Sequence, residues 1–221
     1  TTSHGNTLDS KDYEKMMGQT INKITYYTDN GIYEIDADQY VPVKFNGTIA
    51  AENADVESGK VNLTVEGLPG DYQAEYTVEG LEDVQVKDGA LSYKTKGAEI
   101  GKYTLKVSDK SGKYADLTTD FELTTEAVPV VFNNESAALV AAEGYAAEDV
   151  TSYVKKIESV TVDGTEYAAT GKRAVKIIKE DGTIDTTAAP FKDAENGHGF
   201  KISVKATGYA KDYEFTYTLS Q

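Results

Sequence analysis

The sequence predicts a mainly β protein, built from two small β-sandwich modules of immunoglobulin-like type joined by a short helical segment. A short helix and a hairpin precede them. Three observations predict this class. Apolar residues alternate with polar ones through most of the chain, the alternating segments are short, and turns containing glycine separate them. One stretch, residues 126–157, breaks this rhythm and has helical spacing instead.

The N-terminal part predicts a helix followed by a hairpin. Tyr13, Met16, Met17 and Ile21 share one face of a helix expected within residues 1–22, after a flexible lead-in. Strands at 23–28 and 32–36 then flank an Asp-Asn-Gly turn, whose residues tolerate positive φ. Tyr26 and Tyr27 are neighbours in the first strand and must face opposite sides, so at least one of them is exposed or in a contact.

The first sandwich module is expected to complete residues 23–125. Each of its short strands is apolar on one side, so two sheets must face one another to bury those sides. The expected strands are Val61–Val65, Tyr76–Val78, Val84–Val86, Leu91–Tyr93, Tyr103–Val107 and Leu117–Leu123.

A helical connector is expected over residues 126–157. Its first helix is predicted at Ser136–Glu143, with asparagines before it that can cap its start. Its second helix is predicted at Ala147–Ile157, with Lys155 and Lys156 in the last turn, where the helix dipole favours cations. One face of this second helix carries four apolar residues: Val150, Tyr153, Val154 and Ile157.

The second β module is expected over residues 158–221. Its strands alternate like those of the first module, and its closing hairpin is rich in aromatic residues. The expected strands are Val160–Val162, a return strand at Tyr167, Val175–Ile178, Phe200–Val204 and Tyr213–Leu219.

Composition excludes several functions. The chain has 37 acidic and 22 basic residues, for a formal charge of −15, and such a surface repels nucleic-acid phosphates. No apolar run reaches the roughly 20 residues that cross a bilayer. The absence of cysteine excludes disulfides and thiolate metal sites.

The sequence does not predict an enzyme. His4 lies in the lead-in and His198 in a glycine-flanked turn, and no Gly-x-Ser-x-Gly elbow is present. The many carboxylates make chance pairs common, so no catalytic pair or metal site is assigned. Calcium at Asp-rich turns such as that of Asp29 stays open.

Tyrosine is the composition signal that favours binding, since 16 tyrosines stand on a polar β scaffold. Tyrosine provides a large contact area at a low cost in side-chain entropy and keeps a polar tip. The residues predicted to contact a partner are Tyr26, Tyr27, Tyr153, Lys155, Lys156 and His198.

A family resemblance covers residues 155–219. The stretches Ile157–Tyr167, Val175–Ile184 and Phe200–Tyr209, the last ending in Ala-Thr-Gly-Tyr, resemble the haemoglobin-interacting domain of Gram-positive surface proteins. The whole arrangement also resembles a repeat unit of large wall-anchored proteins of gut Firmicutes, some of which bind immunoglobulin as B-cell superantigens. The resemblance implies an extracellular, wall-attached protein of which this chain is a segment, with neighbouring domains.

The function expected from these features is non-catalytic capture of a host protein, either immunoglobulin or haemoglobin. A helix face with Tyr153, Lys155 and Lys156 suits an antibody domain, whereas a tyrosine pocket with His198 suits haem; no other cofactor is expected. Two alternatives are a structural spacer and a carbohydrate-binding accessory domain.

Overall fold

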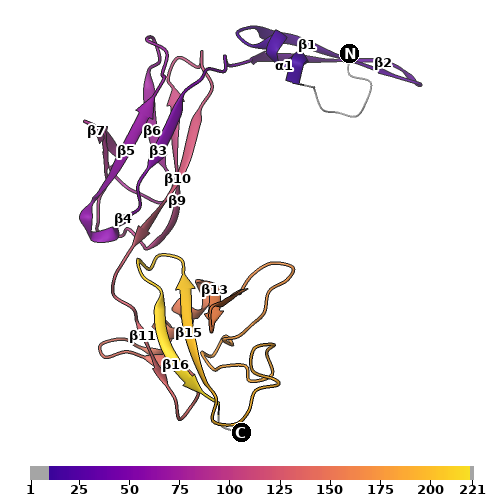
Figure 1. Ribbon diagram of the computed structural model, residues 1–221. Coiled ribbons are helices and arrows are strands. Elements are labelled where there is room, and N and C mark those ends of the chain that lie inside the picture. Colours follow the sequence, from indigo (N-terminus) through magenta and orange to yellow (C-terminus); the bar gives the residue numbers. More distant parts are fainter. Residues whose placement is uncertain (1–9, 220–221) are drawn as a thin grey trace. The chain divides into compact units, whose positions relative to one another are not determined.

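The computed structural model describes residues 10–219 and has a mainly β architecture, which confirms the predicted class (Figure 1). Its contacts divide the chain into two compact units. The first contains the N-terminal hairpin and most of the first sandwich, and the second contains residues 52–61, 93–103 and 121–221.

The first unit begins with α1 (Ser10–Met16), β1 (Thr20–Thr28) and β2 (Gly31–Tyr40), and β1 and β2 form a two-stranded antiparallel sheet. The hairpin is confirmed and is longer than expected. The helix predicted through residue 22 ends earlier, because Gly18 takes a φ of 76° and its N–H donates to the Val41 carbonyl at 2.8 Å. That hydrogen bond joins the segment to the hairpin.

The first sandwich contains two four-stranded sheets and the short 3-10 helix η1 (Val56–Ser58). One sheet has the order β3 (Thr48–Ala51), β5 (Lys60–Glu66), β8 (Ala90–Ser92), β7 (Gln85–Lys87). The other has the order β4 (Ala54–Asp55), β10 (Leu117–Thr124), β9 (Gly101–Asp109), β6 (Ala74–Val78). Alternate residues of these strands are buried, including Leu105 and Val107, as the period-two pattern predicts.

The C-terminal module lies in the second unit. Its main sheet has the order β14 (Thr165–Ala168), β13 (Ile157–Val162), β15 (Gly199–Ala206), β16 (Tyr213–Thr218). A separate hairpin joins β11 (Val130–Asn133) to β12 (Ala138–Ala141), and α2 (Ala147–Lys155) contacts both of its strands.

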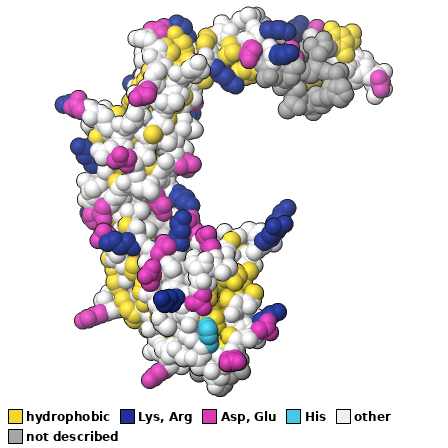
Figure 2. All heavy atoms as spheres, viewed as in Figure 1, with side chains coloured by type: hydrophobic (Ala, Val, Ile, Leu, Met, Phe, Trp, Pro, Cys, Tyr) yellow, Lys and Arg dark blue, Asp and Glu magenta, His cyan; other side chains and the backbone are white. Residues whose placement is uncertain are grey.

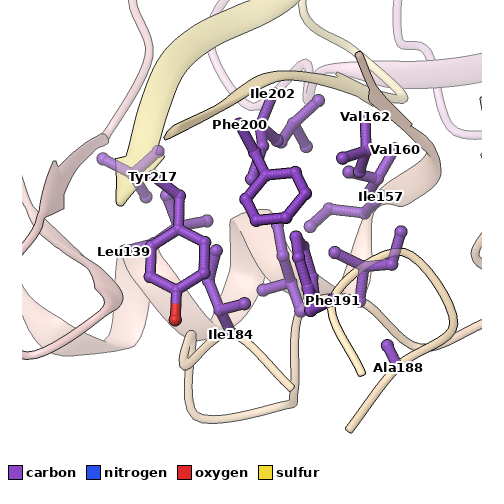
Figure 3. Close-up of a cluster of buried hydrophobic side chains, with 14 of the residues drawn as sticks. Leu139, Ile157, Val160, Val162, Ile184, Ala188, Phe191, Phe200, Ile202 and Tyr217 are labelled. Carbon is purple, nitrogen blue, oxygen red and sulfur yellow. The ribbon is translucent and has the colours of Figure 1, made fainter. Parts of the chain in front are cut away.

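The core of this module gathers buried side chains from every one of these elements except β14, whose half-buried Tyr167 packs against it (Figure 3). The Phe191 ring meets the Phe200 ring edge-on at 4.9 Å between centroids and the Tyr217 ring at 5.6 Å. Phe191 lies in the long segment 169–198, which forms no named strand. The strand predicted at Val175–Ile178 is therefore wrong, because the adjacent Ile177 and Ile178 are both buried and do not alternate.

The helix predicted at Ser136–Glu143 is also wrong, since this segment is the turn and second strand of the β11–β12 hairpin. Ala137 takes a φ of 47°, which a helix does not allow. Pairing with β11 places Val130 and Leu139 together in the core. This burial outweighs the helix preference of an alanine-rich segment.

Candidate functional site

The candidate site is the surface around α2. The helix was predicted at 147–157 and is observed from Ala147 to Lys155. Its first turn is held by the Asp149 carboxylate, whose Oδ2 accepts the Ala146 N–H at 2.8 Å. The 3.6-residue period turns the apolar residues toward the core and leaves an exposed ridge, hereafter the α2 ridge, made of Glu148, Thr151, Ser152 and Lys155.

A pocket lies on one side of the α2 ridge, with a volume of about 260 Å³. Its apolar lining comes from α2, β13 and the segment 169–180, and consists of Val154, Ile157, Val160, Ala169, Ile177 and Ile178. Lys155, Lys176 and Glu180 add charge, and Lys176 pairs with Glu180 at 3.3 Å. We call this the lysine-rimmed pocket.

A second hollow, also of about 260 Å³, lies on the other side of the ridge and is lined in part by Tyr145, Asp149, Ser152 and Tyr209. We call it the tyrosine pocket. Burial raises the pKa of the Tyr209 hydroxyl, and the charges of Tyr145 and Asp149 raise it further. The phenol therefore stays protonated at neutral pH.

Two predicted residues of α2 have different positions from those expected. Tyr153 is only 1% exposed, and its ring packs against that of Tyr209 at 4.8 Å, so it forms no part of an exposed helix face. This corrects the expectation, and the signal was present, because Tyr153 belongs to the apolar stripe of the helix. Lys156 lines the tyrosine pocket, where its ammonium donates to the Ile100 carbonyl at 3.2 Å. Of the residues predicted to contact a partner, only Lys155 lies on the α2 ridge.

His198 is not brought to either pocket. Its ring packs against Phe200 at 4.4 Å between centroids, and its Nε2 lies 3.7 Å from Asp163 Oδ2. About half of its side chain is exposed. Neither the lysine-rimmed pocket nor the tyrosine pocket includes His198 in its lining, so these two do not form the expected pocket of tyrosines with His198.

Tyr26 and Tyr27 lie in the first unit, on the hairpin, with exposed fractions of 43% and 67%.

The sequence did not indicate that Lys176 and Ile178 line the lysine-rimmed pocket, because a strand was expected at these residues.

Residues 10–219 contain no cluster of three or more His, Cys, Asp or Glu residues placed to hold a metal ion. Within the same residues, no helix combines the length and the apolar character needed to cross a bilayer.

One part of the chain, which includes this surface, matches the model of a known family. Residues 129–219 match the family model described as "Heme-binding protein Shr-like, Hb-interacting domain". The match confirms the resemblance expected from residues 155–219 and extends it to include the β11–β12 hairpin and α2. It covers less than half of the chain. No curated protein sequence matches.

Three solved structures are similar only at a coarse level. SGBP-B of the mixed-linkage glucan utilization locus of Bacteroides ovatus, in complex with a mixed-linkage heptasaccharide, has 15% identity and a TM-score of 0.25, over 81% of this chain and 44% of that chain. Tp47, the 47-kilodalton lipoprotein of Treponema pallidum, has 14% identity and a TM-score of 0.29, over 96% and 59%. Domains 6–7 of the surface layer protein SbsC have 11% identity and a TM-score of 0.25, over 80% and 99%.

The chain thus spans about half the length of the first two of these proteins. TM-scores this low support no inference about function.

Proposed function

We propose that this chain is a non-catalytic binding segment of an extracellular bacterial surface protein, and that residues 129–219 capture haemoglobin through the α2 ridge. The observation that carries the proposal is the match of these residues to a haemoglobin-interacting domain family. The fold supports it, because the matched residues include all of α2 and its underlying core.

The shape of the surface suits a protein partner. A ridge with hollows on both sides lets an opposing surface place side chains in each hollow, which is how the anchor residues of protein interfaces are buried. The lysine-rimmed pocket has an apolar lining and the ammonium of Lys155, while the ammonium of Lys176 is paired with Glu180 at 3.3 Å. It therefore suits an apolar side chain that has a carboxylate beside it.

The two pockets offer few groups that could bind the iron of free haem. Haem iron needs an axial ligand such as His, Cys, Met or a tyrosinate. The lysine-rimmed pocket has none of these in its lining. In the tyrosine pocket the surroundings of Tyr209 raise its pKa, which disfavours the tyrosinate that would bind iron, and the exposed Tyr145 supplies the other phenol of the lining. The proposal therefore concerns the haemoglobin protein surface rather than its cofactor.

The test is a binding measurement with the full chain immobilised and human haemoglobin in solution. Thr151→Arg places a bulky cation on the α2 ridge, and Thr216→Arg places the same side chain at an exposed position of β16. We expect the first variant to weaken haemoglobin binding by about 10-fold or more and the second to leave it unchanged. Equal effects of both variants would contradict the α2 ridge as the site.

Two further arms separate the other candidates. Serum immunoglobulin is passed over the same surface, and free haem is added while the Soret band is followed. Binding of immunoglobulin without haemoglobin would transfer the function to an antibody partner. A Soret shift that persists in Thr151→Arg would indicate a haem site elsewhere. Absence of binding in every arm would leave the chain a spacer.

A further inference from the structure

Exposed hydrophobic side chains concentrate on the β1–β2 hairpin. Among residues 10–219, eight large hydrophobic residues are strongly exposed, and six of them lie on these two strands: Ile24, Tyr26, Tyr27, Ile32, Tyr33 and Ile35. Figure 2 shows hydrophobic side chains along the part of the molecule where Figure 1 places β1 and β2. Scattered exposed hydrophobic residues are ordinary, but a concentration on one element indicates an interaction surface.

The strand register gathers four of these residues on one face. Ile24 pairs with Ile35, and Tyr26 pairs with Tyr33. Directly paired residues project to the same side of a sheet, as do residues two apart along a strand. These four side chains, which we call the apolar hairpin face, are between 41% and 55% exposed.

The opposite face of the hairpin has a different character. Tyr27 and Ile32 pair near the turn, and farther along the ammonium of Lys23 donates to the Glu34 carboxylate at 2.8 Å. Thr25 also projects to this side. Only the apolar hairpin face is hydrophobic along its length.

A two-stranded sheet with such a face is only marginally stable alone in water. In the part of the chain that the structure describes, β1 and β2 have no third strand. Covering the apolar hairpin face would therefore stabilise the hairpin as well as the complex.

The charge of the hairpin indicates which kind of partner covers the apolar hairpin face. Residues 20–40 contain four carboxylates, those of Asp29, Glu34, Asp36 and Asp38, and a single lysine, Lys23. The whole chain has a formal charge of −15, so a second copy would be repelled. A partner with basic residues around an apolar centre would be attracted instead.

We propose that the apolar hairpin face docks a protein surface that is apolar at its centre and rimmed by lysine or arginine. The site lies in the first unit and is independent of haemoglobin capture by residues 129–219.

The experiment uses the full chain and a fluorescent peptide of about nine alternating leucine and lysine residues, the length of one of these strands. Such a peptide presents an apolar face and carries basic groups, and a leucine–glutamate peptide of the same pattern is its control. We expect the lysine peptide to bind, the glutamate peptide not to bind, and added salt to weaken the binding.

The matched variants are Tyr26→Thr and Tyr27→Thr, which change adjacent tyrosines on opposite faces. Threonine has a high β-strand propensity, so we expect both variants to retain the hairpin, and far-UV circular dichroism checks this. We expect Tyr26→Thr to weaken peptide binding by about 10-fold, with little effect from Tyr27→Thr. Tyr26→Phe keeps the ring and should keep the binding.

Three results would overturn the proposal. An equal loss of peptide binding in Tyr26→Thr and Tyr27→Thr would show that the peptide does not bind specifically to the apolar hairpin face. Equal binding of the lysine and glutamate peptides would exclude a preference for a basic partner. A dimer in sedimentation equilibrium that Tyr26→Thr dissociates would assign the apolar hairpin face to a second copy instead.

Discussion

The Asp109 carboxylate organises the loop at one end of the first sandwich. It accepts backbone N–H groups from Gln73, Ser111, Lys113 and Tyr114, and also the Ser111 hydroxyl at 2.6 Å. Burial by itself raises the pKa of this carboxyl, but the hydrogen bonds from Ser111, Gln73 and Tyr114 outweigh it and lower the pKa to about 2. Asp109 is therefore a structural carboxylate that is stabilised in its charged form.

Asp109→Asn should lower the melting temperature by several degrees. The amide NH2 of asparagine is a hydrogen-bond donor, so it cannot accept the backbone N–H groups that face it. The pKa of Asp109 is lowered in the folded state from 3.8 to about 2. Its contribution is therefore complete above about pH 4 and is lost as the pH falls toward 2. Thermal melts across this range should show the difference between wild type and variant shrinking with acid.

The control for that comparison is Asp29→Asn, which changes an exposed carboxylate in the hairpin turn. Its melting temperature should follow that of the wild type at every pH. A constant difference between Asp109→Asn and wild type from pH 7 to pH 2 would contradict the assignment.

At the scale of elements, α2 lacks a side-chain cap at its start. Ala146 is the N-cap, with an extended backbone (φ −106°, ψ 171°) and no side chain that can accept a hydrogen bond. Ser and Asp are favoured at this position because their oxygen accepts an N–H of the first turn. The helix currently depends on the Asp149 carboxylate and on core packing.

Ala146→Ser should therefore raise the free energy of unfolding of the C-terminal module by about 1 kcal/mol. Urea unfolding followed by circular dichroism measures this. Ala147→Ser lies one residue later, inside the helix, and should give no gain. A gain from both substitutions would indicate a cause other than capping.

The sequence predicts helices and strands correctly where the period of the apolar residues matches their burial in the structure. Leu105 and Val107 alternate and are buried in a strand, and the spacing of Val150 and Tyr153 gives a helix at the observed place. The predictions fail in segments whose secondary structure is determined by tertiary packing. Leu139 lies in an alanine-rich run with helical preference, yet it pairs with Phe132 across a hairpin.

The candidate site was predictable only in part. Lys155 was expected on an exposed helix face and lies on the ridge. The lysine-rimmed pocket was not expected, since it depends on an irregular segment that brings Lys176 and Ile177 beside α2. Neither residue type nor spacing reveals such a loop, because its shape is set by long-range contacts with the core.

At the scale of the whole molecule, the buried cluster of the C-terminal module is distinct from the buried residues of the first sandwich. Leu105 is fully buried in the first unit, and Phe191 is fully buried in the second. The core cluster that contains Phe191 uses only residues of the second unit. Separate cores allow separate cooperative unfolding.

Calorimetry should therefore resolve two thermal transitions. Leu105→Ala, which costs about 2–5 kcal/mol in a packed core, should lower one of them, and Phe191→Ala, which costs about 3–5 kcal/mol, should lower the other. A single transition that both variants lower would contradict independent unfolding.

The segment 169–198 has a consequence for proteolysis. Arg173 is exposed and lies in this irregular stretch, whereas Ile177, Ile184 and Phe191 farther along are held in the core. An arginine-specific protease should cut after Arg173, the one arginine of the sequence, without releasing a fragment, because β13 and β15, on either side of the cut, remain hydrogen-bonded in the same sheet. The nicked chain should elute as an intact molecule and separate into two pieces only in denaturant.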